Sequence, residues 1–310
     1  MNKETVMFRF VPTMRCNFRC NYCFLDNNIK QNGKTMFDKH SVDDWVEAMM
    51  NYENYDIELY FWGGEPFCIN ETYTLLREWT KLDHIVSGFR IDTNIFYADK
   101  IAELCPSNKI KLNCSYHMQY HTLEQEFEKV KKLKSLDMIG MVNFVASKYN
   151  LDHLKSDYNM TVIDLINKFE EIGVFVNIAG DFAYANNPKY EKYDEYKNFI
   201  LQFINPNEWD WLRNQHSKER LCSAGQKMFT VEYDGTFTSC ISNRKYGNFF
   251  DGTLIFDKEY EICNKSCPSL VAYPFRCDNE FPAINSLLTY VKRNQDYRNE
   301  NLKSYINFEF

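Results

Sequence analysis

Three closely spaced cysteines are the residues of this chain whose type and spacing most directly indicate chemistry. Cys16, Cys20 and Cys23 are separated by three and then two residues, so their thiolates can turn onto one metal centre. Zinc would need a fourth ligand to complete a structural tetrahedron. A four-iron cluster can instead use three thiolates and leave one iron free for a substrate. The spacing alone leaves a zinc loop, an iron-sulfur site and chance clustering open.

A second group of cysteines lies toward the end of the chain, at Cys222, Cys240, Cys263, Cys267 and Cys277. The chain has 11 cysteines in all, an odd number. Its first residues lack the basic and apolar pattern of a signal peptide. We therefore expect metal or redox use of these cysteines rather than a disulfide framework, with a structural zinc ribbon as the alternative for this second group.

A glycine-rich turn follows the second predicted strand and reads Trp62-Gly63-Gly64-Glu65-Pro66. The glycine pair lets the backbone approach a ligand closely, and the carboxylate of Glu65 can accept hydrogen bonds from a ligand ammonium. The turn alone would also suit an ordinary strand-to-helix connection. However, the cysteine loop and this turn end neighbouring strands of one predicted barrel, where barrel enzymes carry their chemistry.

The Cys-x3-Cys-x-aromatic-Cys loop, whose aromatic residue is Tyr22, and the Gly-Gly-Glu-Pro turn together resemble the radical S-adenosylmethionine (radical SAM) enzymes. The resemblance covers roughly residues 5–180. It implies a [4Fe-4S] cluster on Cys16, Cys20 and Cys23, whose fourth iron chelates SAM. One electron would then cleave SAM to a 5'-deoxyadenosyl radical, which abstracts a hydrogen atom from the substrate.

The same resemblance implies a set of SAM-binding residues at the ends of successive strands. Gly63, Gly64 and Glu65 should hold the methionyl amino group. Thr93-Asn94 matches a family Thr-Asn-Gly pattern except that Ile95 replaces the glycine, and Ser115 should reach the ribose or carboxylate. Capped strand ends are the alternative interpretation of Thr93 and Ser115. The full cofactor-binding prediction is Tyr22, Gly63, Gly64, Glu65, Pro66, Thr93, Asn94 and Ser115.

The spacing from Cys222 through Gly235 to Cys240 resembles the SPASM and twitch auxiliary-cluster domains. Two fully thiolate-ligated clusters would need about eight cysteines, and the second group has five. The resemblance therefore implies one auxiliary [4Fe-4S] cluster. Its ligands would be Cys222, Cys240 and two of the three remaining cysteines, Cys263, Cys267 and Cys277.

Candidate catalytic residues follow the fourth predicted strand at the rim of the barrel. His117 and His121 can act as acid, base or hydrogen-bond donor near neutral pH, or belong to an ordinary polar loop. Cys114 can re-donate a hydrogen atom if it lies at the barrel mouth. Strand alternation points it away from the interior if Ser115 points inward, and buried packing is the usual role of an isolated cysteine.

Alternating strand and helix patterns over the first 180 residues predict a partial (β/α)6 TIM-like barrel in the α/β class. The predicted strands are Val6–Pro12, Ile57–Trp62, Arg90–Thr93, Ile110–Ser115, Met141–Ser147 and Val174–Ala179. The predicted helices are Val42–Tyr52, with Ser41 as N-cap, Thr72–Leu82, Ala98–Leu104, Leu123–Leu136 and Val162–Ile172. An open doubly wound sheet is the alternative.

Beyond Gly180 the pattern changes, so we expect domains at 1–205 and 206–310. A bridging helix is predicted at Tyr190–Ile204. The second unit is a small α+β iron-sulfur domain with a hairpin turning on Asp234-Gly235. Short helices are predicted at Trp209–Gln215 and Ile284–Lys292.

The charge balance, 36 basic against 43 acidic residues for a net charge of -7, argues against a nucleic-acid binder. No apolar run is long enough for a membrane span, so we expect a cytoplasmic protein without a membrane partner. The expected activity is oxidation or epimerisation of a hydroxylated small molecule or sugar, with a flavodoxin- or ferredoxin-type electron donor. Maturation of a ribosomally made peptide is the alternative, and a non-catalytic zinc or iron-sulfur protein is the alternative of another class.

Overall fold

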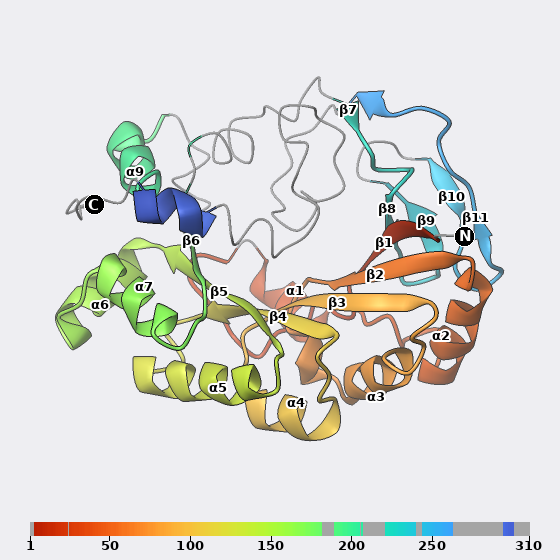
Figure 1. Cartoon of the computed structure of the whole chain (residues 1–310), viewed down its shortest axis with the longest axis horizontal. Helices are drawn as coiled ribbons and strands as arrows, with labels where there is room; N and C mark the ends of the chain where they lie inside the picture. The colour runs from red at the N-terminus through yellow and green to blue at the C-terminus, as the bar shows by residue number, and fades with distance from the viewer. Residues whose placement is uncertain are drawn as a thin grey trace.

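The centre of the fold is a sheet of ten strands in the order β11-β10-β9-β8-β1-β2-β3-β4-β5-β6 (Figure 1). The computed structural model describes residues 3–23, 25–181, 189–204, 206, 221–239, 244–262 and 294–300. Within these residues, no helix is long and apolar enough to cross a membrane.

Six parallel strands form the barrel part of this sheet and confirm the predicted α/β partial barrel. They are β1 Glu4–Phe10, β2 Tyr55–Phe61, β3 Val86–Thr93, β4 Ile110–Tyr116, β5 Ile139–Ala146 and β6 Val176–Gly180. Figure 1 shows α2, α3, α4 and α5 along one face of the sheet. That face carries the apolar half of each strand, including Phe8, Leu59 and Leu112, which are fully buried in the core.

Capping boxes mark the first turns of two of the helices that cover the sheet. Ser41 and Thr122 each form a capping box with the residue three positions on, Asp44 and Gln125, which satisfies otherwise unpaired backbone donors. The helices are α2 Val42–Met49, α3 Asn70–Trp79, α4 Ala98–Leu104, α5 Leu123–Ser135, α7 Val162–Glu170 and α9 Tyr193–Ile200, with short 3-10 turns at Met50–Tyr52 and Pro66–Cys68.

Among the helices that were not predicted from the sequence are α1 Asn27–Asn32 and α6 Lys148–Tyr158. α1 contains a single strongly apolar residue, Ile29, and α6 is mostly polar, so neither shows a clear apolar stripe. Both are instead fixed at their first turn, where Asp26 and Ser147 accept a hydrogen bond from a backbone N–H of the helix.

Four strands that lie between residues 228 and 254 join the barrel sheet. β8 Met228–Val231 pairs in parallel with β1, and β9 Thr236–Thr238, β10 Lys245–Asn248 and β11 Thr253–Leu254 continue outward as an antiparallel extension. β7 Leu221–Cys222 and β12 Glu261–Ile262 form a separate pair. The predicted turn on Gly235 is present, at φ +79°. The boundary at residue 205 stays a prediction, and the predicted helices 209–215 and 284–292 lie outside the described residues.

Candidate active site

The glycine-rich turn after β2 packs directly against the chain that leads into the cysteine loop. The backbone N–H of Gly64 donates to the Thr13 carbonyl at 2.9 Å, and that of Glu65 donates to the Arg15 carbonyl at 2.8 Å. A Cβ atom on Gly64 would lie 2.0 Å from the Arg15 oxygen, and Gly63 has φ +125°. The close backbone approach expected from these glycines is therefore made to the cysteine loop.

Glu65 links the ends of two neighbouring strands. Its side chain is buried and accepts hydrogen bonds from the Phe67 N–H at 3.1 Å, the Thr93 hydroxyl at 2.8 Å and the Asn94 N–H at 2.7 Å. Burial raises the pKa of the Glu65 carboxyl to about 7, against the lowering effect of these donors. Glu65 and Thr93 are therefore in contact, while a bond from Glu65 to a SAM ammonium stays a prediction.

Asn94 carries the connection on to the cysteine loop. Its Nδ2 donates to Asn17 Oδ1 at 2.8 Å and lies 4.0 Å from Cys16 Sγ. The next residue, Ile95, has φ +43°, a left-handed conformation that is rare for a β-branched side chain. Ile95 therefore keeps the backbone conformation that favours the glycine of the resembled Thr-Asn-Gly pattern.

The loop between β4 and α5 holds the cysteine loop from the other side. The ring of Tyr120 stacks on Phe18 at 3.9 Å between centroids, and its hydroxyl accepts from the Arg19 N–H at 2.6 Å. His117 Nδ1 lies 2.7 Å from the Tyr22 hydroxyl and 3.3 Å from Cys20 Sγ. The predicted residues Tyr22 and His117 are therefore in contact.

His121 belongs to the same connection between β4 and α5, and it is buried with both ring nitrogens engaged. Nδ1 lies 2.9 Å from Glu126 Oε2, and Nε2 lies 2.9 Å from Lys129 Nζ. Burial raises the pKa of Glu126 and lowers that of Lys129. The His121 ring also contacts Phe18 edge-on at 5.5 Å. This arrangement braces the cysteine loop, and a catalytic role for His117 or His121 stays a prediction.

Cys114 and Ser115 point to opposite faces of β4. Cys114 is fully buried in the hydrophobic core, on the helix-covered side, whereas Ser115 is half-buried. Burial raises the pKa of the Cys114 thiol well above its usual range. The structure therefore places Cys114 within the core rather than at the barrel mouth, and its role as a hydrogen-atom donor stays an untested prediction.

The donor set of the cysteine loop fits an iron-sulfur cluster. Cys16, Cys20 and Cys23 all belong to one loop of the chain. Burial and the neighbouring thiols raise the pKa of Cys20 to about 12, and they also raise the pKa of Cys16. Thiols so placed ionise readily only when a cationic centre offsets their mutual repulsion. In the described part of the chain, no three His, Cys, Asp or Glu side chains are placed to hold a single metal ion.

Of the second cysteine group, the structure describes Cys222, which is buried at the end of β7. The other four predicted ligands, Cys240, Cys263, Cys267 and Cys277, lie outside the described residues. The auxiliary cluster therefore stays a prediction.

Sequence reasoning missed a row of polar side chains across the inner face of β1 to β4, opposite the helix-covered face. The row comprises Arg9, Tyr60, Trp62, Asp92 and Asn113. Tyr60 and Asn113 donate to the two oxygens of Asp92 at 2.6 and 2.8 Å. Polar residues at alternate positions of otherwise apolar strands were the available signal.

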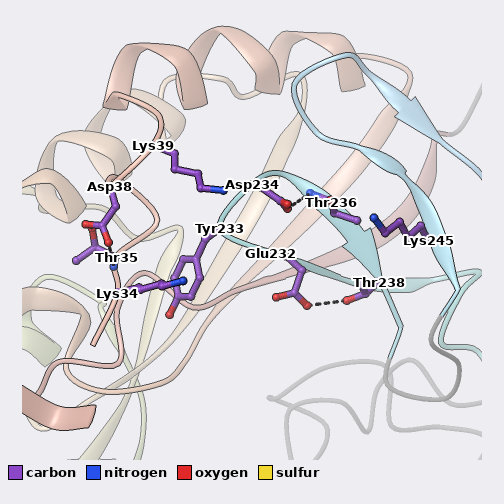
Figure 2. Close-up of a pocket in the computed structure, with 10 residues that line it drawn as sticks. All are labelled: Lys34, Thr35, Asp38, Lys39, Glu232, Tyr233, Asp234, Thr236, Thr238 and Lys245. Atoms are coloured by element: carbon purple, nitrogen blue, oxygen red, sulfur yellow. Dashed lines mark hydrogen bonds between the residues drawn. The ribbon is translucent and has the colours of Figure 1, made fainter. Parts of the chain in front are cut away.

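A surface pocket of about 420 Å³ lies elsewhere, between residues 34–39 and the hairpin of β8 and β9 (Figure 2). Lysine and acidic side chains line it together, and a hydrogen bond of 2.9 Å joins Thr238 to Glu232 within it. None of the predicted site residues is among its lining residues.

Comparisons with known proteins agree with this geometry. A family model described as a 4Fe-4S single cluster domain matches residues 6–87, the segment that holds the cysteine loop and the glycine-rich turn. The radical SAM cyclopropyl synthase TigE of Paramaledivibacter caminithermalis is 21% identical over 197 residues, which cover 56% of this chain and 42% of that relative. This chain therefore matches less than half the length of that relative.

Solved structures of similar fold extend the likeness to nearly the whole chain. A histidine-tagged anSMEcpe with bound AdoMet has a TM-score of 0.53 at 16% identity, covering 96% of this chain and 94% of that one. Streptococcus suis SuiB bound to the precursor peptide SuiA has a TM-score of 0.52 at 15% identity, covering 92% and 67%. At these identities the two structures show a shared barrel fold, with the cysteine loop and its partner turn lying together on it in this chain.

Proposed function

We propose that this protein is a radical SAM enzyme that cleaves SAM reductively and abstracts a hydrogen atom from its substrate. The observation that carries the proposal is the packing of Gly63-Gly64-Glu65 against the backbone that leads into Cys16. A non-catalytic zinc or iron-sulfur protein would need the three cysteines, but it would not need this turn.

Different residues of the chain would serve different parts of this function. Cys16, Cys20 and Cys23 would hold a [4Fe-4S] cluster, which with bound SAM supplies a 5'-deoxyadenosyl radical. The turn at Gly63 and Gly64 fixes the start of the cysteine loop. Glu65, bound by Thr93 and Asn94, fixes the spacing between the ends of β2 and β3.

Aromatic side chains close the other side of the loop. Phe18 and Tyr120 stack face to face, and Tyr22 packs on His117 with a centroid distance of 5.9 Å. Burial lowers the pKa of His117 to about 3, so its imidazole is neutral near pH 7. These contacts pack aromatic rings against one side of the cysteine loop, and we propose that they limit the access of water to a reactive radical there.

For the reaction type, we propose oxidation or epimerisation, with the cysteines from Cys222 onward holding one auxiliary [4Fe-4S] cluster that accepts an electron. A flavodoxin- or ferredoxin-type donor and a cytoplasmic location complete the proposal. The substrate is a hydroxylated small molecule, a sugar or a peptide. The peptide gains support from SuiB, solved with a precursor peptide, and from anSMEcpe, solved with the peptide Kp18Cys at a TM-score of 0.51.

Anaerobic reconstitution followed by iron, sulfide and EPR analysis tests this proposal. We expect about eight irons per chain, falling to about four when Cys16, Cys20 and Cys23 are all changed to Ala. Dithionite-driven formation of 5'-deoxyadenosine from SAM should disappear in the same triple variant. Cys105→Ala, which removes a buried cysteine on the helix side, is the matched control and should keep both readouts.

Other outcomes separate the alternatives. About four irons in the wild type, all lost in the triple variant, would leave the SAM-cleaving activity and remove the auxiliary cluster. Zinc without iron under competent reconstitution would contradict the radical SAM proposal and favour the non-catalytic alternative.

A further inference from the structure

The inner polar row of Arg9, Tyr60, Trp62, Asp92 and Asn113 is built as one connected unit. Tyr60 Oη donates to Asp92 Oδ2 at 2.6 Å, and Asn113 Nδ2 donates to Asp92 Oδ1 at 2.8 Å. The guanidinium carbon of Arg9 lies 5.8 Å from the centroid of the Tyr60 ring and 5.4 Å from that of the Trp62 ring. Each member therefore restrains its neighbour across four strands.

Three polar atoms of this row are left without a partner. Arg9 Nε, Trp62 Nε1 and Asn113 Oδ1 are shielded from solvent and make no hydrogen bond with the described residues. Asn113 is fully buried, since none of its surface is exposed. Buried polar groups in folded proteins are nearly always paired, so each such atom calls for an explanation. One explanation is a ligand that supplies the missing hydrogen-bond partners.

The chemistry of the three atoms defines the ligand. Arg9 Nε and Trp62 Nε1 are N–H donors, and Asn113 Oδ1 is an acceptor. An amide group presents the complement, because its carbonyl oxygen accepts two hydrogen bonds and its N–H donates one. A hydroxyl also accepts two hydrogen bonds and donates one, but it does so from a single oxygen. The two donors lie on β1 and directly after β2 and the acceptor lies on β4, so a group that carries its acceptor and its donor on separate atoms fits the row better. Arg9, Trp62 and Asp92 are each partly exposed, so solvent reaches the edge of the row, although the three unpartnered atoms themselves are covered.

We propose that the inner polar row binds a main-chain amide of a peptide substrate, with Arg9 and Trp62 donating to its carbonyl oxygen and Asn113 accepting from its N–H. The inference rests on the proposed function and narrows its substrate class to peptides. Asp92 acts as a positioning residue, because its two oxygens hold Tyr60 and the amide nitrogen of Asn113, which turns Asn113 Oδ1 toward the ligand.

The test uses the full chain, anaerobically reconstituted, and N-acetylglycine N-methylamide as probe. Saturation-transfer NMR on the probe's methyl signals gives its dissociation constant. The matched probe N-acetylsarcosine N,N-dimethylamide keeps both carbonyl groups but has no N–H. We expect the wild type to bind the first probe at least about fivefold more tightly than the second, because only the first donates to Asn113.

Two variants locate the binding. Asn113→Leu removes the acceptor and Trp62→Phe removes a donor, and each should weaken binding of the first probe at least about fivefold. Asn167→Leu, an exposed position on α7, is the matched control and should leave binding within about twofold. Thermal unfolding of each variant shows whether it folds. If a variant does not, the comparison of the two probes in the wild type still decides.

Several results would overturn the inference. These are equal binding of the two probes to the wild type, unchanged binding in both folded variants, or binding of myo-inositol in place of the amide, which would assign the row to a hydroxylated small molecule. SAM cleavage is measured separately in the wild type. Absent amide binding with intact SAM cleavage refutes the amide site alone, whereas amide binding without SAM cleavage refutes the proposed function and leaves the site.

Discussion

Glu65 is buried among three donors, and its raised pKa gives the stability of the protein a specific pH dependence. Its pKa rises from 4.5 to about 7, chiefly because burial disfavours the charged form. As pH rises from about 4.5 to about 7, the unfolded chain releases this proton before the folded one does. The contribution of Glu65 to stability is therefore fully present below about pH 4.5 and falls by about 3 kcal/mol by pH 7.

Glu65→Gln removes this titration, so we expect the stability of the wild type minus that of the variant to fall by about 3 kcal/mol between about pH 4.5 and about pH 7. Urea unfolding of the reduced apoprotein at each pH measures the free energy of unfolding of both proteins. The variant is subtracted because burial lowers the pKa of His117 to about 3, so that below about pH 6.5 His117 makes the stability of both proteins rise with pH. Glu71→Gln, at an exposed position in the first turn of α3, is the control. A flat difference curve would show that Glu65 is not buried as described.

At the scale of elements, the contact between the glycine-rich turn and the cysteine loop should decide whether a cluster can be loaded. A Cβ at position 64 would meet backbone atoms, the carbonyl oxygens of Arg15 at 2.0 Å and Met14 at 2.6 Å. Backbone cannot rotate away as a side chain can, so Gly64→Ala must displace the start of the cysteine loop. We expect a loss of about 1–3 kcal/mol in stability and less than half the wild-type iron after reconstitution.

Gly88→Ala provides the comparison within the same sheet. Its added Cβ would lie 3.5 Å from the Lys109 carbonyl oxygen, an ordinary van der Waals distance. This variant should load iron like the wild type. If Gly64→Ala also loads normally, the turn does not position the cysteine loop and the main support for the proposed function is lost.

An element can be predicted from the sequence when the residues that determine it are close together along the chain. The six barrel strands were located because each is a short apolar run, and α2 begins after Ser41 because the cap is a neighbour in sequence. The stack of Phe18 on Tyr120 could not be predicted, because it joins residues about a hundred positions apart. α6 was missed because its sequence shows little apolar periodicity.

The same distinction separates the parts of the candidate site that were predicted from the part that was missed. The cysteine loop and the turn at Gly63 were recognised because their residues are adjacent in sequence. The inner polar row was missed because each strand contributes one or two members, such as Arg9 in β1 and Asp92 in β3. These become a unit only when the parallel register sets Arg9 opposite Tyr60 and Asp92 opposite Asn113. The role expected for Cys114 depended on which face of β4 carries its side chain. The helices cover that face, so Cys114 lies in the core.

At the scale of the whole molecule, aromatic packing joins the strands beyond residue 220 to the barrel. Phe237 of β9 is fully buried and lies 5.0 Å from Phe8 of β1 and 5.9 Å from Tyr52 between ring centroids. The hydroxyl of Tyr52 also donates to the Phe249 carbonyl at 3.1 Å. Because β8 pairs with β1 along the same edge, this part of the chain shares the hydrophobic core of the barrel.

Phe237→Ala should therefore destabilise the barrel and the added strands together, by about 3–5 kcal/mol. Urea unfolding followed by near-UV and far-UV circular dichroism should show one transition in both signals, shifted to lower urea. Ile255→Ala, which truncates an exposed side chain after β11, should cost less than about 0.5 kcal/mol. Two separated transitions, with only the smaller one shifted by Phe237→Ala, would contradict a shared core. They would show instead that the chain beyond residue 206 unfolds as its own unit, as the domain boundary expected from the sequence requires.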